Sequence, residues 1–319
     1  MKKLAATLLV LMAATVQGIA VAEEFPTRSI KYVLPFQGIP DSLARTYNDR
    51  VSAILKQPVV HDFKPGAAGR ISLSEIARAK PDGYTIGMAS TAPFMIHPLV
   101  VKKLPYDAEK SFAVINVLGV SAMALAVSKN SGIKTLEDLR NLSKKRELNI
   151  ATGGVAGPHH LAAILLQQAG FRATLIHYKT SAEVLTVMMN GQIDAFFSTI
   201  EQQSVFEKQG FYQTIGVTSP KRSSHLPDTP TFTELGLPEI DTHTFYATVA
   251  PAATPRAVLD RLAAAYAQAA ESPEVKALFQ KAALQSVNMP RAELEAMIRK
   301  ERVKWKQFVE KHSITVGEQ

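Results

Sequence analysis

The feature that most constrains this chain is a regular alternation of short apolar runs with longer amphipathic segments, which begins near Ile30. Short runs rich in β-branched residues are typical of strands, and apolar residues that recur every three or four positions are typical of helices. Strands that alternate with helices build mostly parallel sheets. Strands are expected at residues 30–34, 59–63, 84–89, 114–120, 148–151, 174–177, 195–197 and 214–217.

Capping residues mark where several helices begin. Thr135 stands before Glu137 and Asp138, and a hydroxyl followed by acidic side chains suits the positive end of a helix. Thr254 and Ser272 each precede a proline, which is favoured at the first helical position. The chain is therefore expected to end in helices at about residues 255–271, 273–283 and 290–311.

The first 22 residues have the composition of a signal peptide, with cleavage expected after Ala22. Lys2 and Lys3 give a positive start, residues 4–16 form a short apolar run, and residues 20–22 are small. A run this short spans a bilayer poorly, since a spanning helix needs about 20 residues. The sequence has no cysteine, which argues against disulfides and a lipid anchor. A soluble periplasmic protein is expected.

Length predicts two lobes. About 297 residues (319 minus 22) exceed the ~250 residues that one core usually supports. Two strongly apolar segments, 123–127 and 245–250, flank a block that contains its own alternation of strands and helices. The expected division is a discontinuous first lobe of residues 23–122 plus 246–319 and a second lobe of residues 123–245. The two apolar segments would then be crossing strands that act as the hinge.

The charge pattern argues against a nucleic-acid binder. Loss of Lys2 and Lys3 lowers the formal net charge from +8 to +6. The densest basic cluster, residues 144–146, is followed at once by Glu147, without the interleaved aromatic residues that nucleic-acid surfaces use. It is interpreted as a solvated helix end.

The most informative local segment is the glycine-rich turn of residues 151–160, between an expected strand and an expected helix. Glycines there allow backbone N–H groups to point at an anion near a helix N-terminus. The P-loop and dinucleotide-binding patterns are both absent, so a carboxylate is the simpler ligand. The same turn could also be no more than a tight connection. The ligand contacts expected from it are Thr152, Gly153, Gly154, Ala156 and Gly157.

Two further strand-to-helix turns, residues 35–41 and 89–93, are expected to face the same crevice, because ligands of open α/β sheets bind beyond the carboxyl ends of strands. Phe36 could form an apolar wall of the site or belong to the core. The other candidates are Gln37, Gly38 and Asp41 in the first turn and Ser90 and Thr91 in the second.

His159 and His160 raise the question of a metal or catalytic site. Adjacent helical residues point about 100° apart, and no acidic or histidine partner stands at zinc spacing, so no metal is expected. The Gly-x-Ser-x-Gly pattern and a cysteine nucleophile are absent, so neither catalysis nor a cofactor is expected. Either histidine could donate a hydrogen bond to a ligand near Gly153, or simply lie at a capped helix start.

Seven short motifs appear together in a characteristic order. They are KPGAAG at 64–69, KPDGYT at 80–85, KLPYD at 103–107, YKTSA at 178–182, NGQID at 190–194, VTSPKR at 217–222 and LPDTPT at 226–231. With these motifs the chain resembles the periplasmic binding components of tripartite tricarboxylate transporters, called the Bug type. The similarity runs from residue 25 to the helix that contains Trp305.

The resemblance implies a Venus-flytrap protein that holds a small carboxylate and presents it to a membrane permease. Its implied ligand contacts come from residues 36–41, from Ser90 and Thr91, and from residues 152–160, and Tyr178 and Ser198 complete the expected set. Two departures separate this chain from the family. The first turn is about two residues shorter and keeps one glycine, and Ser198 stands where many members carry aspartate. The identity of the ligand is therefore not inferred from the family.

The expected function is thus that of a periplasmic solute-binding protein, a monomer in the simplest arrangement, that delivers a carboxylate to integral-membrane transporter subunits. A sensor that passes the closed form to a membrane receptor is the alternative, and an enzyme acting on a small acid is a further one. Binding without turnover would separate the first two from the third.

Overall fold

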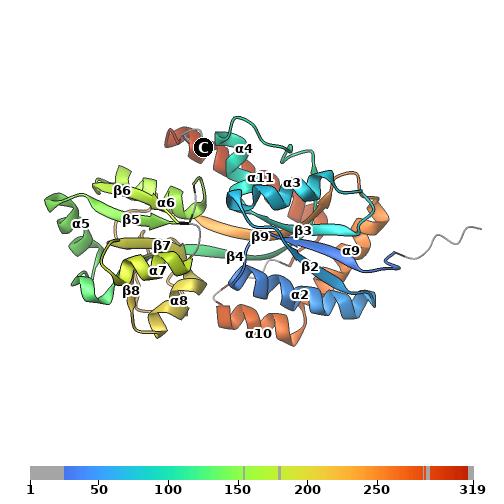
Figure 1. Ribbon diagram of the computed structural model, residues 1–319, viewed down its shortest axis with the longest axis horizontal. Coiled ribbons are helices and arrows are strands. Elements are labelled where there is room, and N and C mark those ends of the chain that lie inside the picture. Colours follow the sequence, from blue (N-terminus) through green and yellow to red (C-terminus); the bar gives the residue numbers. More distant parts are fainter. Residues whose placement is uncertain (1–24, 154, 179–180, 283, 285–287, 315–319) are drawn as a thin grey trace, which may run out of the picture.

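The computed structural model describes residues 25–153, 155–178, 181–282, 284 and 288–314. The strands follow the order β2-β1-β3-β9-β4-β7-β5-β6, and β8 also pairs with β4. Figure 1 shows two lobes side by side, with β4 and β9 running between them. None of the helices in this described part of the chain is both long and apolar enough to cross a bilayer.

The first lobe is the part built on β2, β1, β3, β9 and the start of β4. Strands β1, β2 and β3 are parallel, and β9 is antiparallel to both β3 and β4. Figure 1 shows α2 and α10 on one side of this sheet and α3, α4 and α11 on the other. Its strands are β1 (Ile30–Leu34), β2 (Val59–Phe63), β3 (Thr85–Ser90), β4 (Phe112–Ser128) and β9 (His243–Pro251). Its helices are α2 (Ile39–Leu55), η1 (Ala67–Gly69), α3 (Arg70–Arg78), η2 (Ala92–Ile96), α4 (His97–Val100), α9 (Arg256–Ala270), α10 (Pro273–Ala282) and α11 (Arg291–Lys311).

The second lobe is built on the end of β4 with β5 to β8. Strand β5 lies parallel to β6 and to β7, whereas β7 and β8 are antiparallel to β4. Its further strands are β5 (Leu148–Thr152), β6 (Ala173–His177), β7 (Ala195–Thr199) and β8 (Tyr212–Val217). Its helices are η3 (Lys129–Ser131), α5 (Leu136–Lys145), α6 (Pro158–Gln168), α7 (Ser181–Met189) and α8 (Ile200–Lys208).

Strand β4 joins the two lobes without a break. It pairs with β9 from Phe112 to Ala122 and then with β7 from Met123 to Val127. Two separate strands were predicted here, at 114–120 and 123–127, and that prediction was wrong. Only Ser121 and Ala122 lie between the two runs, and neither residue favours a turn strongly enough to interrupt a strand that has partners on both sides.

Helix α11 contacts both lobes. Trp305 packs in the core of the first lobe, whereas Lys304 Nζ lies 3.3 Å from Asp241 and Lys311 Nζ lies 2.7 Å from Glu239. These two acids stand in the segment between β8 and β9. Helix α11 therefore contacts the second lobe as well as the core of the first.

The predicted helix caps have mixed outcomes. The Thr135 hydroxyl accepts from the Asp138 N–H at 3.1 Å, and the Asp138 carboxylate accepts in return, which confirms a capping box. Ser272 Oγ accepts from Val275 N at 3.4 Å. The Thr254 prediction was wrong, because Pro255 itself occupies the N-cap of α9 and the Thr254 hydroxyl makes no hydrogen bond to the described residues.

Candidate ligand-binding site

The turn after β1 leads directly into α2. Gly38 is the N-cap residue, with a φ of 80° that a residue with a side chain adopts only under strain. Phe36 is half-buried against the core, and Gln37 is exposed. Asp41 is already paired, since its Oδ1 lies 2.9 Å from Arg45 Nε and 3.3 Å from His61 Nδ1. The structure therefore gives Asp41 a structural role in holding the turn.

The turn after β3 is hydrogen-bonded to β9, one of the two strands that run between the lobes. Thr91 is fully buried, and its Oγ1 accepts from the backbone N–H of Phe245 at 2.8 Å. Ser90 is buried beside it and pairs with Tyr246 in the sheet. A β-carbon built on Gly69 would lie 3.2 Å from Pro93 and 3.5 Å from the ring of Phe36. The turns after β1 and β3 therefore meet around Gly69.

The glycine-rich turn after β5 is held by one hydrogen bond within the turn and by others to the end of β6. Ala156 has a φ of 54°, and its N–H donates to Nδ1 of His160 at 2.9 Å. Thr152 Oγ1 lies 2.6 Å from Nδ1 of His177, and its carbonyl accepts from Tyr178 N at 3.1 Å. Gly154 lies outside the described residues.

These bonds distinguish the roles of the two adjacent histidines. Because Nδ1 of His160 accepts a hydrogen bond, that nitrogen carries no proton and serves to shape the turn. Nδ1 of His159 is buried and makes no hydrogen bond to the described residues. β-carbons built on Gly153 and Gly157 would lie 3.6 and 3.7 Å from this atom. Burial lowers the pKa of each histidine to about 4, so both are neutral at pH 7.

Turns from the two lobes contact one another. His97 of α4 is buried, and its Nε2 lies 3.4 Å from the carbonyl oxygen of Val155 in the glycine-rich turn. A β-carbon on Gly157 would lie 4.0 Å from that of Ala92. Ala156 and Leu161 also pack in one apolar cluster with Phe94. The turns after β3 and β5 therefore lie face to face at the lobe boundary.

A fourth segment at this boundary was only partly predicted from the sequence. Ser198, at the end of β7, is fully buried with an Oγ that makes no hydrogen bond to the described residues. Three residues later Glu201 is 1% exposed, and its Oε2 accepts a hydrogen bond from Ser121. No local signal selects Glu201 in the sequence, because it stands in the polar first turn of a helix, where acids are common.

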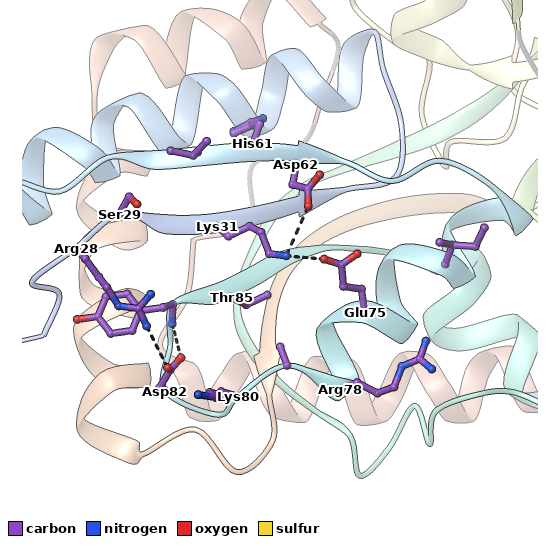
Figure 2. A pocket seen from close by; sticks show the side chains of 14 residues that line it. Arg28, Ser29, Lys31, His61, Asp62, Glu75, Arg78, Lys80, Asp82 and Thr85 are labelled. Carbon is purple, nitrogen blue, oxygen red and sulfur yellow. Dashed lines mark hydrogen bonds and ion pairs between the residues drawn. The ribbon is translucent and has the colours of Figure 1, made fainter.

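A wide groove of about 1030 Å³ lies elsewhere, on the first lobe (Figure 2). None of the residues expected to bind ligand lines it. Lys31 Nζ lies 2.6 Å from Glu75 and 3.6 Å from Asp62, and Arg28 lies 3.4 Å from Asp82. The charges drawn in the groove thus largely pair with each other, and the groove does not resemble the expected carboxylate site.

The paired lobes, the continuous strand β4 and the facing turns define an α/β periplasmic-binding-protein fold. Residues 43–314 match the family described as the tripartite tricarboxylate transporter family receptor, so the chain belongs to this family. The predicted resemblance is confirmed. The family is one of transport receptors and not of enzymes.

Individual relatives agree with this assignment. A UPF0065 protein of Bordetella bronchiseptica is 32% identical over 317 residues, which cover 98% of this chain and 94% of that protein. The periplasmic binding protein BugD is 25% identical, with a TM-score of 0.83 over 91% of this chain and 99% of BugD. R. palustris Rpa4515, solved with adipate, is 24% identical, with a TM-score of 0.85 over 92% of this chain and 99% of that chain. At 24% identity, the similarity to Rpa4515 is one of fold.

Proposed function

We propose that this protein captures a small carboxylate between its lobes and delivers it to the membrane subunits of a tripartite tricarboxylate-type transporter. The observation that carries the proposal is the contact between His97 in the first lobe and Val155 in the glycine-rich turn of the second lobe. It supports a site to which both lobes contribute. The adipate bound to Rpa4515 supports the ligand class.

The proposed site comprises the turns at the carboxyl ends of β1, β3, β5 and β7, with Tyr178 beyond β6. A carboxylate held by backbone N–H groups exchanges its hydration for several oriented donors, so its shape can determine specificity. His159 contributes a neutral ring whose Nδ1 makes no hydrogen bond to the described residues. Asp41 and His160 act by holding the turns in place, since the Asp41 carboxylate is paired with Arg45 and Nδ1 of His160 accepts from the Ala156 N–H.

The transport mechanism is a shift in population between open and closed lobe arrangements. A ligand that touches both lobes binds the closed arrangement better and therefore increases its population. The proposed lobes are residues 23–122 plus 246–319 and residues 123–245. The pairing switch of β4 at Ala122 and Met123 supports this boundary. Export with cleavage after Ala22 belongs to the same proposal, and this segment lies outside the described residues.

Calorimetry tests the proposal with mono-, di- and tricarboxylates, including aromatic acids. Saturable binding of at least one acid, with one site per chain and no turnover of the acid, is expected. Native mass spectrometry of protein purified without refolding gives a second readout, because a bound acid adds its mass to the chain. Absence of binding to every acid, with folded protein in the calorimeter cell, would contradict the proposal.

A further inference from the structure

The carboxyl end of β7 lies beside the glycine-rich turn. Strands β5 and β7 are parallel neighbours, with Ile150 opposite Ala195 and Ala151 opposite Phe196. Their carboxyl ends therefore lie at the same edge of the sheet, and the residues that follow β7 border the same region as residues 152–153 and 155–157. Helix α8 begins there, at Ile200.

Glu201 projects from this helix start toward the hinge. Its Oε2 accepts from Ser121, which lies on β4 opposite Thr244 of β9, just before β4 enters the second sheet. Tyr246 of β9 lies close enough for Glu201 to influence its ionisation. Glu201 is thus enclosed by both hinge strands and by the start of α8.

The Glu201 carboxyl is incompletely satisfied. Its Oε1 is buried and makes no hydrogen bond within the geometric limits to the described residues, and none of their basic side chains lies within ion-pair distance of it. The Ser121 and Thr199 hydroxyls and the backbone of Glu201 favour the ionised carboxyl, but they do not offset its burial, which raises its pKa. A buried carboxylate without a cationic partner is unfavourable, and a donor or cation supplied from outside would stabilise it. A second carboxylate placed against it would face like charge unless one of the two takes up a proton.

We propose that Oε1 of Glu201 accepts a hydrogen bond from an ammonium or amide nitrogen of the ligand. This inference rests on the proposed function and makes it more specific. The cargo is then an organic acid with a nitrogen donor at its far end: the turns hold its carboxylate, and Glu201 at the hinge binds its nitrogen. Plain dicarboxylates are disfavoured.

The experiment compares matched acids by calorimetry. The series consists of straight-chain acids of four to six carbons whose far end is a methyl, carboxylate, ammonium or amide group. The six-carbon members are hexanoate, adipate, 6-aminohexanoate and adipamate. The wild-type protein is expected to bind an ammonium- or amide-ended acid more tightly than the dicarboxylate of equal length. Glu201→Gln should weaken the ammonium-ended acid at least about tenfold and weaken the dicarboxylate less, or not at all.

Glu207→Gln is the matched control, because Glu207 lies on the same helix and its Oε2 accepts from the Thr214 hydroxyl at 2.6 Å, away from the hinge. It should leave the order of affinities unchanged. The melting temperature of each variant shows whether it folds. The order of affinities of the acids for the wild-type protein tests the inference even if a variant fails to fold.

Proton exchange gives an independent readout. Burial raises the pKa of Glu201 to about 7, whereas the facing Tyr246 is kept neutral by a pKa above its usual range. His159 and His160 are also neutral at pH 7, as their pKa values are about 4. Binding of an ammonium-ended acid would ionise Glu201, which then releases its proton to the buffer. Calorimetric titrations in buffers of different ionisation enthalpy measure this proton release, and Glu201→Gln should abolish it.

The outcomes separate the two claims. Equal or tighter binding of plain dicarboxylates by the wild-type protein, or an unchanged order of affinities in Glu201→Gln, would overturn the role of Glu201 and leave the carboxylate receptor intact. If none of the acids binds, in this series or in the wider panel, the proposed function fails and the inference fails with it.

Discussion

At the scale of single residues, the proposed site combines glycines, which leave space for a ligand, with buried polar atoms that make no hydrogen bond to the described residues. Gly153 and Gly157 hold the space in front of His159, and neither has a positive φ, so a methyl group there would fill space without straining the backbone. This property separates an effect on binding from an effect on folding.

Gly153→Ala is therefore expected to impair binding and leave the fold intact. Its β-carbon would lie at an ordinary contact distance of 3.6 Å from His159, in the space proposed for the carboxylate. The variant should lose about tenfold or more in affinity, because a group that cannot accept the turn's hydrogen bonds displaces one that can. Calorimetry checks this, and the melting temperature without ligand should stay within a few degrees of wild type. Wild-type affinity would place the ligand elsewhere.

The Glu201 carboxyl also makes a prediction about stability and pH. Its pKa rises from 4.5 in the unfolded chain to about 7 in the folded protein through burial. A raised carboxyl pKa stabilises the fold below about pH 4.5, and this contribution is lost as pH rises through about 7. The loss is at most about 3.5 kcal/mol, from roughly 1.4 kcal/mol for each unit of the rise in pKa.

Glu201→Gln cannot ionise, so its free energy of unfolding should fall less than that of wild type between pH 5 and pH 8. Urea denaturation of both proteins at pH 5 and pH 8 gives their free energies of unfolding. The contributions of all other titrating groups cancel when the two proteins are compared. Parallel pH profiles for the two proteins would mean that Glu201 ionises as easily in the folded protein as in the unfolded chain.

At the scale of helices and strands, the two threonines that precede the starts of α5 and α9 have opposite environments. Thr135→Ala removes a capping box and should cost about 1 kcal/mol of stability. Thr254→Val keeps the shape of a buried side chain whose hydroxyl has no partner among the described residues, so it should be neutral or slightly stabilising. Denaturant midpoints test both, and equal losses would contradict these capping assignments.

Most elements were predictable because their signals are local. The strand β2 was predicted at its observed bounds, and α10 and α11 within a residue or so, from β-branched runs and from proline at helix starts. The continuity of β4 was not predictable, since it depends on pairing with strands that are far away in the sequence. The Thr254 prediction failed because Pro255 took the cap position.

The site shows the same limit. The positions of the turns follow from the sequence, but it could not show that the Ala156 N–H donates to His160 or that Asp41 pairs with Arg45. Glu201 was missed because its burial arises only when β4, β9 and α8 meet between the lobes. Local patterns therefore locate the strand-to-helix turns, whereas the hydrogen bonds and ion pairs that distinguish the roles of their residues depend on the assembled fold.

At the scale of the whole molecule, β4, β9 and helix α11 connect the two lobes, and the proposed closure would have to accommodate these connections. Beyond β4 and β9, α11 adds the pairs Lys304–Asp241 and Lys311–Glu239. Exposed pairs like these contribute little each, typically under about 1 kcal/mol. We expect Lys311→Ala to change the melting temperature by no more than a few degrees. A melting-temperature loss of ten degrees or more would show that the Lys311–Glu239 pair contributes far more than an exposed ion pair does.

The central claim is that one ligand is held by both lobes. The chain has no cysteine, so Asp49→Cys on α2 and Lys144→Cys on α5 allow two spin labels to be placed on exposed positions of different lobes. Pulsed electron resonance then measures the distance between them with and without the acid that calorimetry identifies. The distribution should narrow, with its population shifted toward one closed distance. A saturating ligand that leaves the distribution unchanged would contradict the claim.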